Sequence, residues 1–227
     1  MSLPHLAISP SQSDLVIFDC DGVLIDSEWI ACQVEAEVLH EDGFDIDAAA
    51  VRRLLLGLSV SSAIKVLQRE FGRMPGADIL QRIKERTAAA FAARLEAIPG
   101  IHDLLDRLVA RRCVASSSDP ERLQQTLTQV GLYHRLAPHI FSATMVVNGK
   151  PAPDLFLHAA SRMGAAPGRC LVIEDSVAGV KAARAAGMAV IGFIGGRHCD
   201  ETHGAALAAA GADRIIAGYG ELASAAA

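Results

Sequence analysis

Carboxylate, hydroxyl and ammonium side chains follow four short apolar runs of this 227-residue sequence. In chain order the runs are followed by Asp19 and Asp21, by Ser116–Ser118, by Lys150, and by Glu174 with Asp175. Reactive residues of an open parallel sheet lie just past the carboxyl ends of the strands. If the four runs are parallel strands, these side chains share one pocket. Each of them alone is weak evidence of a functional site, but together they are strong evidence.

The pocket predicted in this way is rich in negative charge. Three or four carboxylates at one place repel one another unless a hard cation neutralises them. Mg²⁺ is the natural candidate, because it takes few carboxylates and keeps positions open for water and phosphate oxygens. We therefore expect a magnesium site among Asp19, Asp21, Glu174 and Asp175.

A carboxylate beside Mg²⁺ can attack phosphorus and form an aspartyl-phosphate. The transferring phosphoryl group carries charge on three oxygens, which a metal, a hydroxyl with backbone N–H groups, and a lysine can hold. Ser116, with its neighbour Ser117, and Lys150 have the side-chain types for the last two positions. The set thus indicates phosphoryl transfer.

Each of these residues also has a simpler interpretation. Asp19 and Asp21 beside Gly22 could form a turn, and the serines could cap a helix. Lys150 could be a solvated loop residue, and the Glu174–Asp175 pair could favour the positive end of the following helix. Only the occurrence of all four groups in order favours the functional interpretation.

The elements that would position these residues alternate along the chain. Short, continuous apolar runs are typical of strands that are buried on both faces, and they occur at Leu15–Phe18, Cys113–Ser116, His139–Ser142, Cys170–Ile173, Val190–Phe193 and Arg214–Ile216. Amphipathic helical stretches lie between them, one capped by Ser118 or Asp119 with Pro120 in its first turn. This alternation predicts a doubly wound (Rossmann-like) α/β core with a parallel sheet.

Residues 27–97 interrupt that alternation. They contain four helical patterns and no strand-like run, whereas a crossover helix needs only about a dozen residues. The patterns cover Ser27–His40, Asp47–Leu56, Ser59–Phe71 and Asp78–Leu95. The sequence therefore predicts an inserted helical cap domain at 27–97, a core of residues 1–22 and 98–227, and hinges at Gly22 and Pro99–Gly100.

Composition excludes several classes of protein. The chain is 51% hydrophobic, enough for a sizeable core, and its formal charge of −5 argues against a nucleic-acid binder, which needs a basic face. No apolar run reaches the roughly 18 residues of a membrane span. The N-terminus does not resemble a secretion signal, and the five cysteines form no C-x-x-C pair, so we expect a cytoplasmic protein. The sequence RHCDETH at residues 197–203 is either a polar loop or a surface metal site, and the loop is favoured because two histidines five apart do not share a helix face.

Four segments, FDCDGVLIDSE, ASSS, GKPAPD and IEDSVAG, together resemble the motifs of the haloacid dehalogenase superfamily, in its branch with a helical cap after the first strand. The resemblance spans roughly residues 15–190. It implies that Asp19 is the nucleophile and that Asp21 is the general acid and base and offers its backbone carbonyl to Mg²⁺. It implies further that Ser116 and Lys150 hold the phosphoryl group, and that Asp175 is the main acidic metal ligand, with Glu174 acting through water.

The resemblance favours a phosphatase that acts on a small phosphorylated metabolite. Dehalogenases of the superfamily lack the second aspartate, so Asp21 favours phosphoryl transfer. The motifs are similar to those of sugar-phosphate and sugar-acid-phosphate phosphatases, such as 6-phosphogluconate phosphatases, and of β-phosphoglucomutases. The mutases have a histidine and an arginine where this chain has Ala31 and Val60, which favours hydrolysis. A mutase remains the alternative function, and a non-catalytic binding protein is a third possibility. For the oligomeric state we expect a monomer or a weak homodimer.

Overall fold

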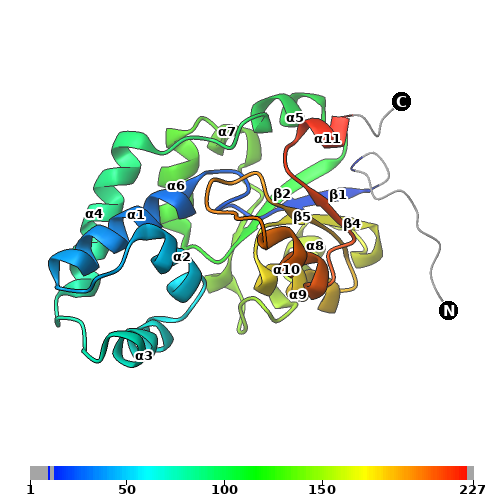
Figure 1. Cartoon of the computed structure of the whole chain (residues 1–227). Helices are drawn as coiled ribbons and strands as arrows, with labels where there is room; N and C mark the ends of the chain where they lie inside the picture. Colours follow the sequence, from blue (N-terminus) through cyan, green and yellow to red (C-terminus); the bar gives the residue numbers. More distant parts are fainter. Residues whose placement is uncertain (1–9, 11–12, 224–227) are drawn as a thin grey trace. The chain divides into compact units, whose positions relative to one another are not determined.

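The computed structural model describes residue 10 and residues 13–223, and it divides the chain into two compact units (Figure 1). One unit, the sheet unit, reaches from the N-terminal segment to Asp26 and resumes at Glu96; the other, the helical unit, runs from Ser27 to Leu95. Within the described residues, no helix is long and apolar enough to cross a membrane.

The sheet unit contains a six-stranded sheet in the order β3-β2-β1-β4-β5-β6, in which all neighbouring strands are parallel. The strands are β1 (Leu15–Phe18), β2 (Arg111–Ser116), β3 (Ile140–Ser142), β4 (Cys170–Glu174), β5 (Ala189–Phe193) and β6 (Arg214–Ile216). The order reverses between β1 and β4, where Phe18 pairs with Ile173. The predicted doubly wound α/β fold is confirmed, and its switch point lies at the ends of β1 and β4.

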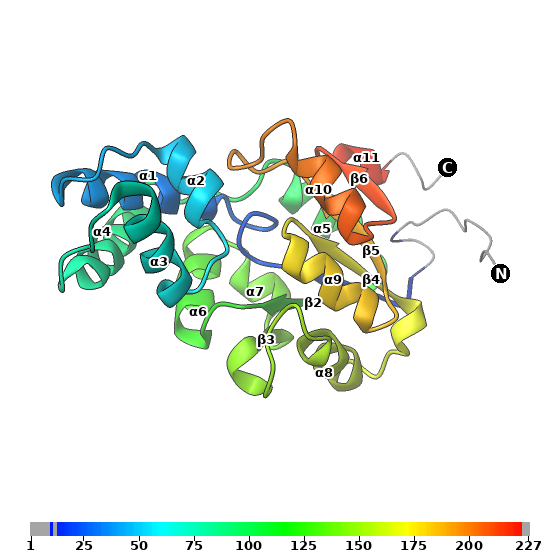
Figure 2. The same ribbon diagram turned by 60° about the horizontal axis from the view of Figure 1, so that its bottom comes forward.

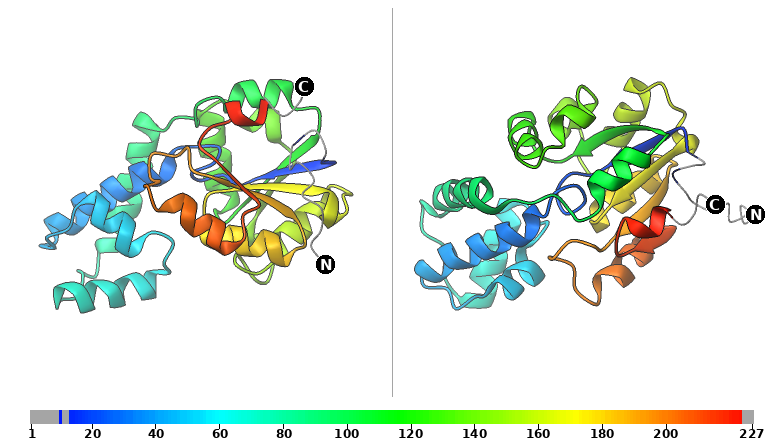
Figure 3. Two further views of the ribbon diagram at one scale, coloured as in Figure 1. Left: turned by 45° about the vertical axis from the view of Figure 1, so that its right-hand side comes forward. Right: turned by 90° about the horizontal axis from the view of Figure 1, so that it is seen from above.

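Helices cover both faces of this sheet, as Figures 2 and 3 show. They are α5 (Ile101–Arg107), α6 (Pro120–Gln129), α7 (Tyr133–Leu136), α8 (Asp154–Arg162), α9 (Val177–Ala185), α10 (His203–Ala210) and α11 (Gly220–Ala223), with short 3₁₀ turns at Ala143–Met145 and Pro167–Arg169. Alternate strand residues such as Leu15 and Ile17 pack with apolar residues of α8, α9 and α10 in one buried cluster. Because strand side chains alternate between faces, the remaining strand residues face the other layer, where Phe193 stacks on Tyr219 with ring centroids 4.7 Å apart.

Helix α6 begins as its sequence predicts. The Asp119 carboxylate accepts a 2.9 Å hydrogen bond from the Arg122 backbone N–H, and Pro120 occupies the first turn, where its missing N–H costs nothing. The sequence left Ser118 or Asp119 as the cap, and the structure selects Asp119. Ser118 is thereby left to make a different contact, described below.

The helical unit consists of α1 (Ser27–Glu41), α2 (Ala48–Leu55), α3 (Val60–Phe71) and α4 (Ile79–Arg94). Asp47 and Ser59 accept hydrogen bonds from the first turns of α2 and α3, which satisfies backbone N–H groups that have no partner within the helix. A half-open pocket of about 200 Å³, lined mostly by apolar residues, lies in this unit, and Glu35 is among its lining residues.

The two segments of the sheet unit that lead to and from the helical unit are paired with each other. The Asp26 N–H donates to the Glu96 carbonyl at 3.0 Å, and the Ile98 N–H donates to the Leu24 carbonyl at 2.9 Å. The division between the units falls at 26/27 and 95/96. The sequence predicted a core that ends at residue 22 and resumes at 98, and a cap at 27–97. Gly22 and Gly100 lie inside the sheet unit.

Candidate active site

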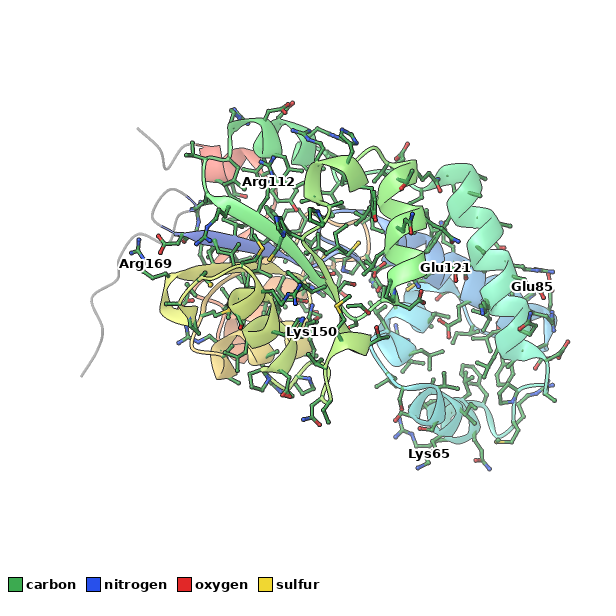
Figure 4. All side chains as sticks on the ribbon, turned by 180° about the vertical axis from the view of Figure 1, so that it is seen from behind. Lys65, Glu85, Arg112, Glu121, Lys150 and Arg169 are labelled. Carbon is green, nitrogen blue, oxygen red and sulfur yellow. The ribbon has the colours of Figure 1, made fainter. Side chains whose placement is uncertain are left out.

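Lys150 joins the ends of three strands. Its ammonium group lies 2.7 Å from Asp19 Oδ1 and 2.7 Å from Glu174 Oε2, and its side chain is 5% exposed. Asp19 follows β1 and Glu174 ends β4, while Lys150 lies on the connection after β3. Figure 4 labels Lys150 and, at the amino end of β4, Arg169. Asp19, Lys150 and Glu174, three of the charged residues predicted from strand ends, thus meet at the switch point of the sheet.

Glu174 is fully buried and bonded through both of its oxygens. Oε2 accepts from Lys150, while Oε1 accepts from the Ser176 backbone N–H at 3.1 Å and from the Ser176 hydroxyl at 2.6 Å. The following helix makes room for this carboxylate, because a Cβ atom on Gly179 would lie 2.0 Å from it. Glu174 is therefore held rigidly and fixes Lys150 in turn.

Asp19, Glu174 and Asp175 form a buried acidic cluster in which one oxygen from each lies within 4.8 Å of the others. Burial and the neighbouring Glu174 raise the pKa of Asp19 well above its usual range, and the same two causes raise the pKa of Asp175. Burial by itself would lower the pKa of Lys150, but Asp19 and Glu174 reverse that effect and raise it above the ordinary lysine value. One ammonium cannot neutralise three carboxylates, so the cluster fits a divalent cation with oxygen ligands.

Asp21 is bound through both of its carboxylate oxygens. The Ser118 hydroxyl donates to Oδ2 at 2.7 Å, and the Arg122 guanidinium lies 2.8 Å from Oδ1. Ser118 is anchored by the Ser142 hydroxyl, which donates to its carbonyl at 2.7 Å. The first turn of α6 thus orients Asp21.

The serines after β2 have different environments. Ser116 is 1% exposed and its hydroxyl accepts a 3.1 Å hydrogen bond from the Ser118 backbone N–H, whereas Ser117 is exposed. The structure therefore brings Asp19, Lys150, Glu174 and Asp175 into direct contact or close proximity, and it joins Asp21 to Ser118. The sequence did not predict the contact between Asp21 and Arg122, because the two residues lie 101 positions apart and no local pattern distinguishes this arginine from others.

The protein has a doubly wound α/β sheet, and an acidic cluster with a lysine lies at the switch point of that sheet. Comparison with known proteins gives its family. Residues 13–187 match the family of haloacid dehalogenase-like hydrolases. The chain belongs to this family, as the four motifs predicted.

Three known proteins illustrate the relationship. The 6-phosphogluconate phosphatase of Escherichia coli is 30% identical over 189 residues, which cover 83% of this chain and 86% of the relative. A haloacid dehalogenase-like protein of Agrobacterium tumefaciens has a crystal structure that superposes with a TM-score of 0.89, is 39% identical and covers 94% of this chain and 97% of its own. A family hydrolase of Deinococcus radiodurans, crystallised with phosphate and sodium, has a TM-score of 0.83, is 34% identical and covers 94% of this chain and 95% of its own.

Proposed function

We propose that this chain is a Mg²⁺-dependent phosphatase that hydrolyses a small phosphorylated metabolite at the ends of β1, β2 and β4. The observation that carries the proposal is the contact of Lys150 with both Asp19 and Glu174, beside Asp175. In this proposal Asp19 would act as the nucleophile, next to the fixed positive charge of Lys150 and beside carboxylates that would bind the cation. The names of the relatives bear out the phosphatase class.

Asp19 would attack phosphorus through its carboxylate and break the bond between phosphorus and the ester oxygen. Lys150 and the Ser116 hydroxyl, with Ser117, would hold the oxygens of the phosphoryl group. Asp21 would donate a proton to the departing oxygen and then accept one from the water that hydrolyses the aspartyl-phosphate. General acid–base catalysis of this kind contributes about 10²–10⁴-fold.

Asp19, Asp175 and Glu174, the last through water, would hold the cation, with the Asp21 backbone carbonyl as a further ligand. When bound, Mg²⁺ supplies charge that stabilises the ionised carboxylates and the phosphoryl oxygens. The raised pKa values of Asp19 and Asp175 support this role, because burial and mutual repulsion leave the cluster short of positive charge.

The substrate class is a sugar phosphate or sugar-acid phosphate, and the helical unit, from Ser27 to Leu95, would serve as a cap that selects it. Support comes from the names of two relatives, 6-phosphogluconate phosphatase and fructose-1-phosphate phosphatase. Closing of such a cap excludes bulk water from the reaction.

Phosphate release from a panel of sugar phosphates, sugar-acid phosphates and nucleotides, with Mg²⁺ and with EDTA, tests this function. We expect metal-dependent release from one group of sugar esters. Asp19→Asn should abolish turnover in a folded protein, and Asp21→Ala should accumulate phosphoenzyme on rapid acid quench. Conversion of an aldose 1-phosphate to its 6-phosphate without phosphate release would show a mutase instead. Full activity of Asp19→Asn would exclude the proposed nucleophile.

A further inference from the structure

The segment between β5 and α10 places an imidazole against Asp175. His198 is 2% exposed, and its Nε2 lies 2.9 Å from Asp175 Oδ2. Two glycines make room for the ring: a Cβ atom on Gly196 or on Gly22 would lie 2.7 Å from it. The sequence thus leaves space on two sides for a histidine behind a carboxylate of the acidic cluster.

A second imidazole holds the same residue through its backbone. His203 is the first residue of α10, and its Nε2 lies 2.6 Å from the Asp175 carbonyl oxygen. A carbonyl oxygen only accepts hydrogen bonds, so this nitrogen carries the proton and donates it. The rings of His198 and His203 pack edge to face with centroids 5.5 Å apart. The two histidines come together because His198 lies in the loop before the helix, so they need not share a helix face.

These histidines lie beside Cys199, and the three residues have the types of a site for a soft metal ion. Their ligand atoms lie within 4.8 Å of one another, and the Cys199 sulfur is 3.4 Å from His198 Nε2. However, the Nε2 of His203 carries a proton that bonds to the Asp175 carbonyl, so this nitrogen is not free to ligate a metal. The Nε2 of His198 is likewise placed to donate to an acceptor, the Asp175 carboxylate. The geometry therefore favours hydrogen bonds to Asp175 over a metal centre.

We propose that His198 and His203 are positioning residues that fix Asp175 and thereby set the affinity of the acidic cluster for Mg²⁺. This inference rests on the proposed function, in which Asp175 is a metal ligand. Glu174 and Asp19 repel the Asp175 carboxylate when all three are ionised. A hydrogen bond from His198 to Asp175 Oδ2 would help to keep that carboxylate in place. Hydrogen-bond partners that orient a metal ligand typically change metal affinity by about 10–100-fold when they are removed.

The test is Mg²⁺ binding to the whole chain without substrate, measured by isothermal titration calorimetry. His198→Met removes the donor at similar volume and should weaken Mg²⁺ binding by about 10–100-fold, while kcat at saturating Mg²⁺ changes much less. His198→Gln can donate from its amide and should restore most of the affinity. His158→Met is the matched control, since His158 packs edge-on against Phe141 in the same unit, and it should leave the affinity unchanged.

Wild-type Mg²⁺ affinity in a folded His198→Met protein would overturn the proposal. If that variant does not fold, His203→Ala and His203→Gln make the same comparison at the partly buried second histidine. Stoichiometric zinc in the purified protein that is lost in Cys199→Ser would show a soft-metal site and also overturn it. Asp175→Asn separates the two levels: unchanged Mg²⁺ affinity there refutes the proposed metal site, whereas lost affinity there with a normal His198→Met refutes only the positioning role.

Discussion

Gly22 lies so close to Asp175 that a Cβ atom at this glycine would be 1.9 Å from Asp175 Oδ2. Gly22 also has a φ of +75°, a conformation that residues with a side chain adopt at a cost. The glycine of the first motif therefore has two separate functions: it closes the turn after Asp21, and it lets the loop after β1 approach the end of β4.

These two functions can be separated with one pair of variants. Gly187 has a similar φ of +73° but no atom within 4 Å of its hypothetical Cβ. In Gly187→Ala the free energy of unfolding should fall only by the cost of the left-handed conformation, about 1–2 kcal/mol. This variant should bind Mg²⁺ normally. Gly22→Ala should lose more stability in urea unfolding and also weaken Mg²⁺ binding in calorimetry. Equal losses of stability with equal Mg²⁺ affinities would show that the contact with Asp175 is unimportant.

Magnesium should stabilise the folded protein, because a ligand that binds only the native state adds RT ln(1 + [L]/Kd) to the free energy of unfolding. At a concentration 100 times Kd this is about 2.7 kcal/mol, and it should appear as a rise in melting temperature that EDTA reverses. Asp175→Asn should remove most of the rise. Asp103→Asn, which changes an exposed acid of α5, should keep it. A rise that persists in Asp175→Asn would place the cation elsewhere.

Removing the buried ammonium should be costly in the metal-free protein. Lys150→Met leaves Asp19 and Glu174 without the charge that bonds to both, and breaking a buried ion pair by deleting one partner typically destabilises by about 3–5 kcal/mol. Urea unfolding in EDTA measures the loss. Lys181→Met, at an exposed position of α9, should change the free energy of unfolding little. A similar small change in both variants would contradict the structural role of Lys150.

Arg122 should matter for turnover although it lies outside the four motifs. Arg122→Gln removes the charge next to Asp21 Oδ1 but keeps the backbone N–H that Asp119 caps. We expect kcat to fall by roughly 10- to 100-fold, a part of the roughly 10²–10⁴-fold that general acid–base catalysis supplies. Arg184→Gln is the control, because Arg184 pairs with Asp213 on the surface of the same unit. Steady-state kinetics with saturating Mg²⁺ measure kcat of both variants. Equal kcat values would show that Arg122 does not contribute to turnover.

The family and the sheet could be predicted because a parallel sheet brings together residues that are distant in the sequence. Once the apolar runs are parallel strands, the residues after Phe18 and Ile173 must meet, since these two are register partners. The ends of the strands were harder to predict, because polar residues can extend a strand beyond its apolar run. Strand β2 begins at Arg111 and not at Cys113, since Arg111 and Arg112 pair with Leu15 and Val16. Element boundaries therefore shift by one or two residues while element types hold.

The contacts that the sequence did not predict involve loops and helix ends. Arg122 and His198 reach Asp21 and Asp175 only through the packing of separate connections against one sheet edge. No periodicity encodes such a contact, because each partner is fixed by its own turn. In RHCDETH only His203 belongs to a helix, because α10 begins there, so the two histidines meet although residues five apart on a helix do not share a face.

The helical unit contains a carboxylate that should destabilise it at neutral pH. Burial raises the pKa of Glu35, which lines the half-open pocket of this unit, so the folded state binds its proton more tightly than the unfolded chain does. Its contribution to stability is then complete below the unfolded pKa of about 4.3 and is lost as the pH rises through the folded pKa. Glu35→Gln should therefore unfold at higher urea than the wild type at pH 7, and at about the same urea near pH 4. Glu37→Gln, at an exposed position of the same helix, is the control for replacing a glutamate of this helix by glutamine. A Glu35→Gln protein that is less stable than the wild type at pH 7 would show that the ionised carboxylate is favourable where it lies.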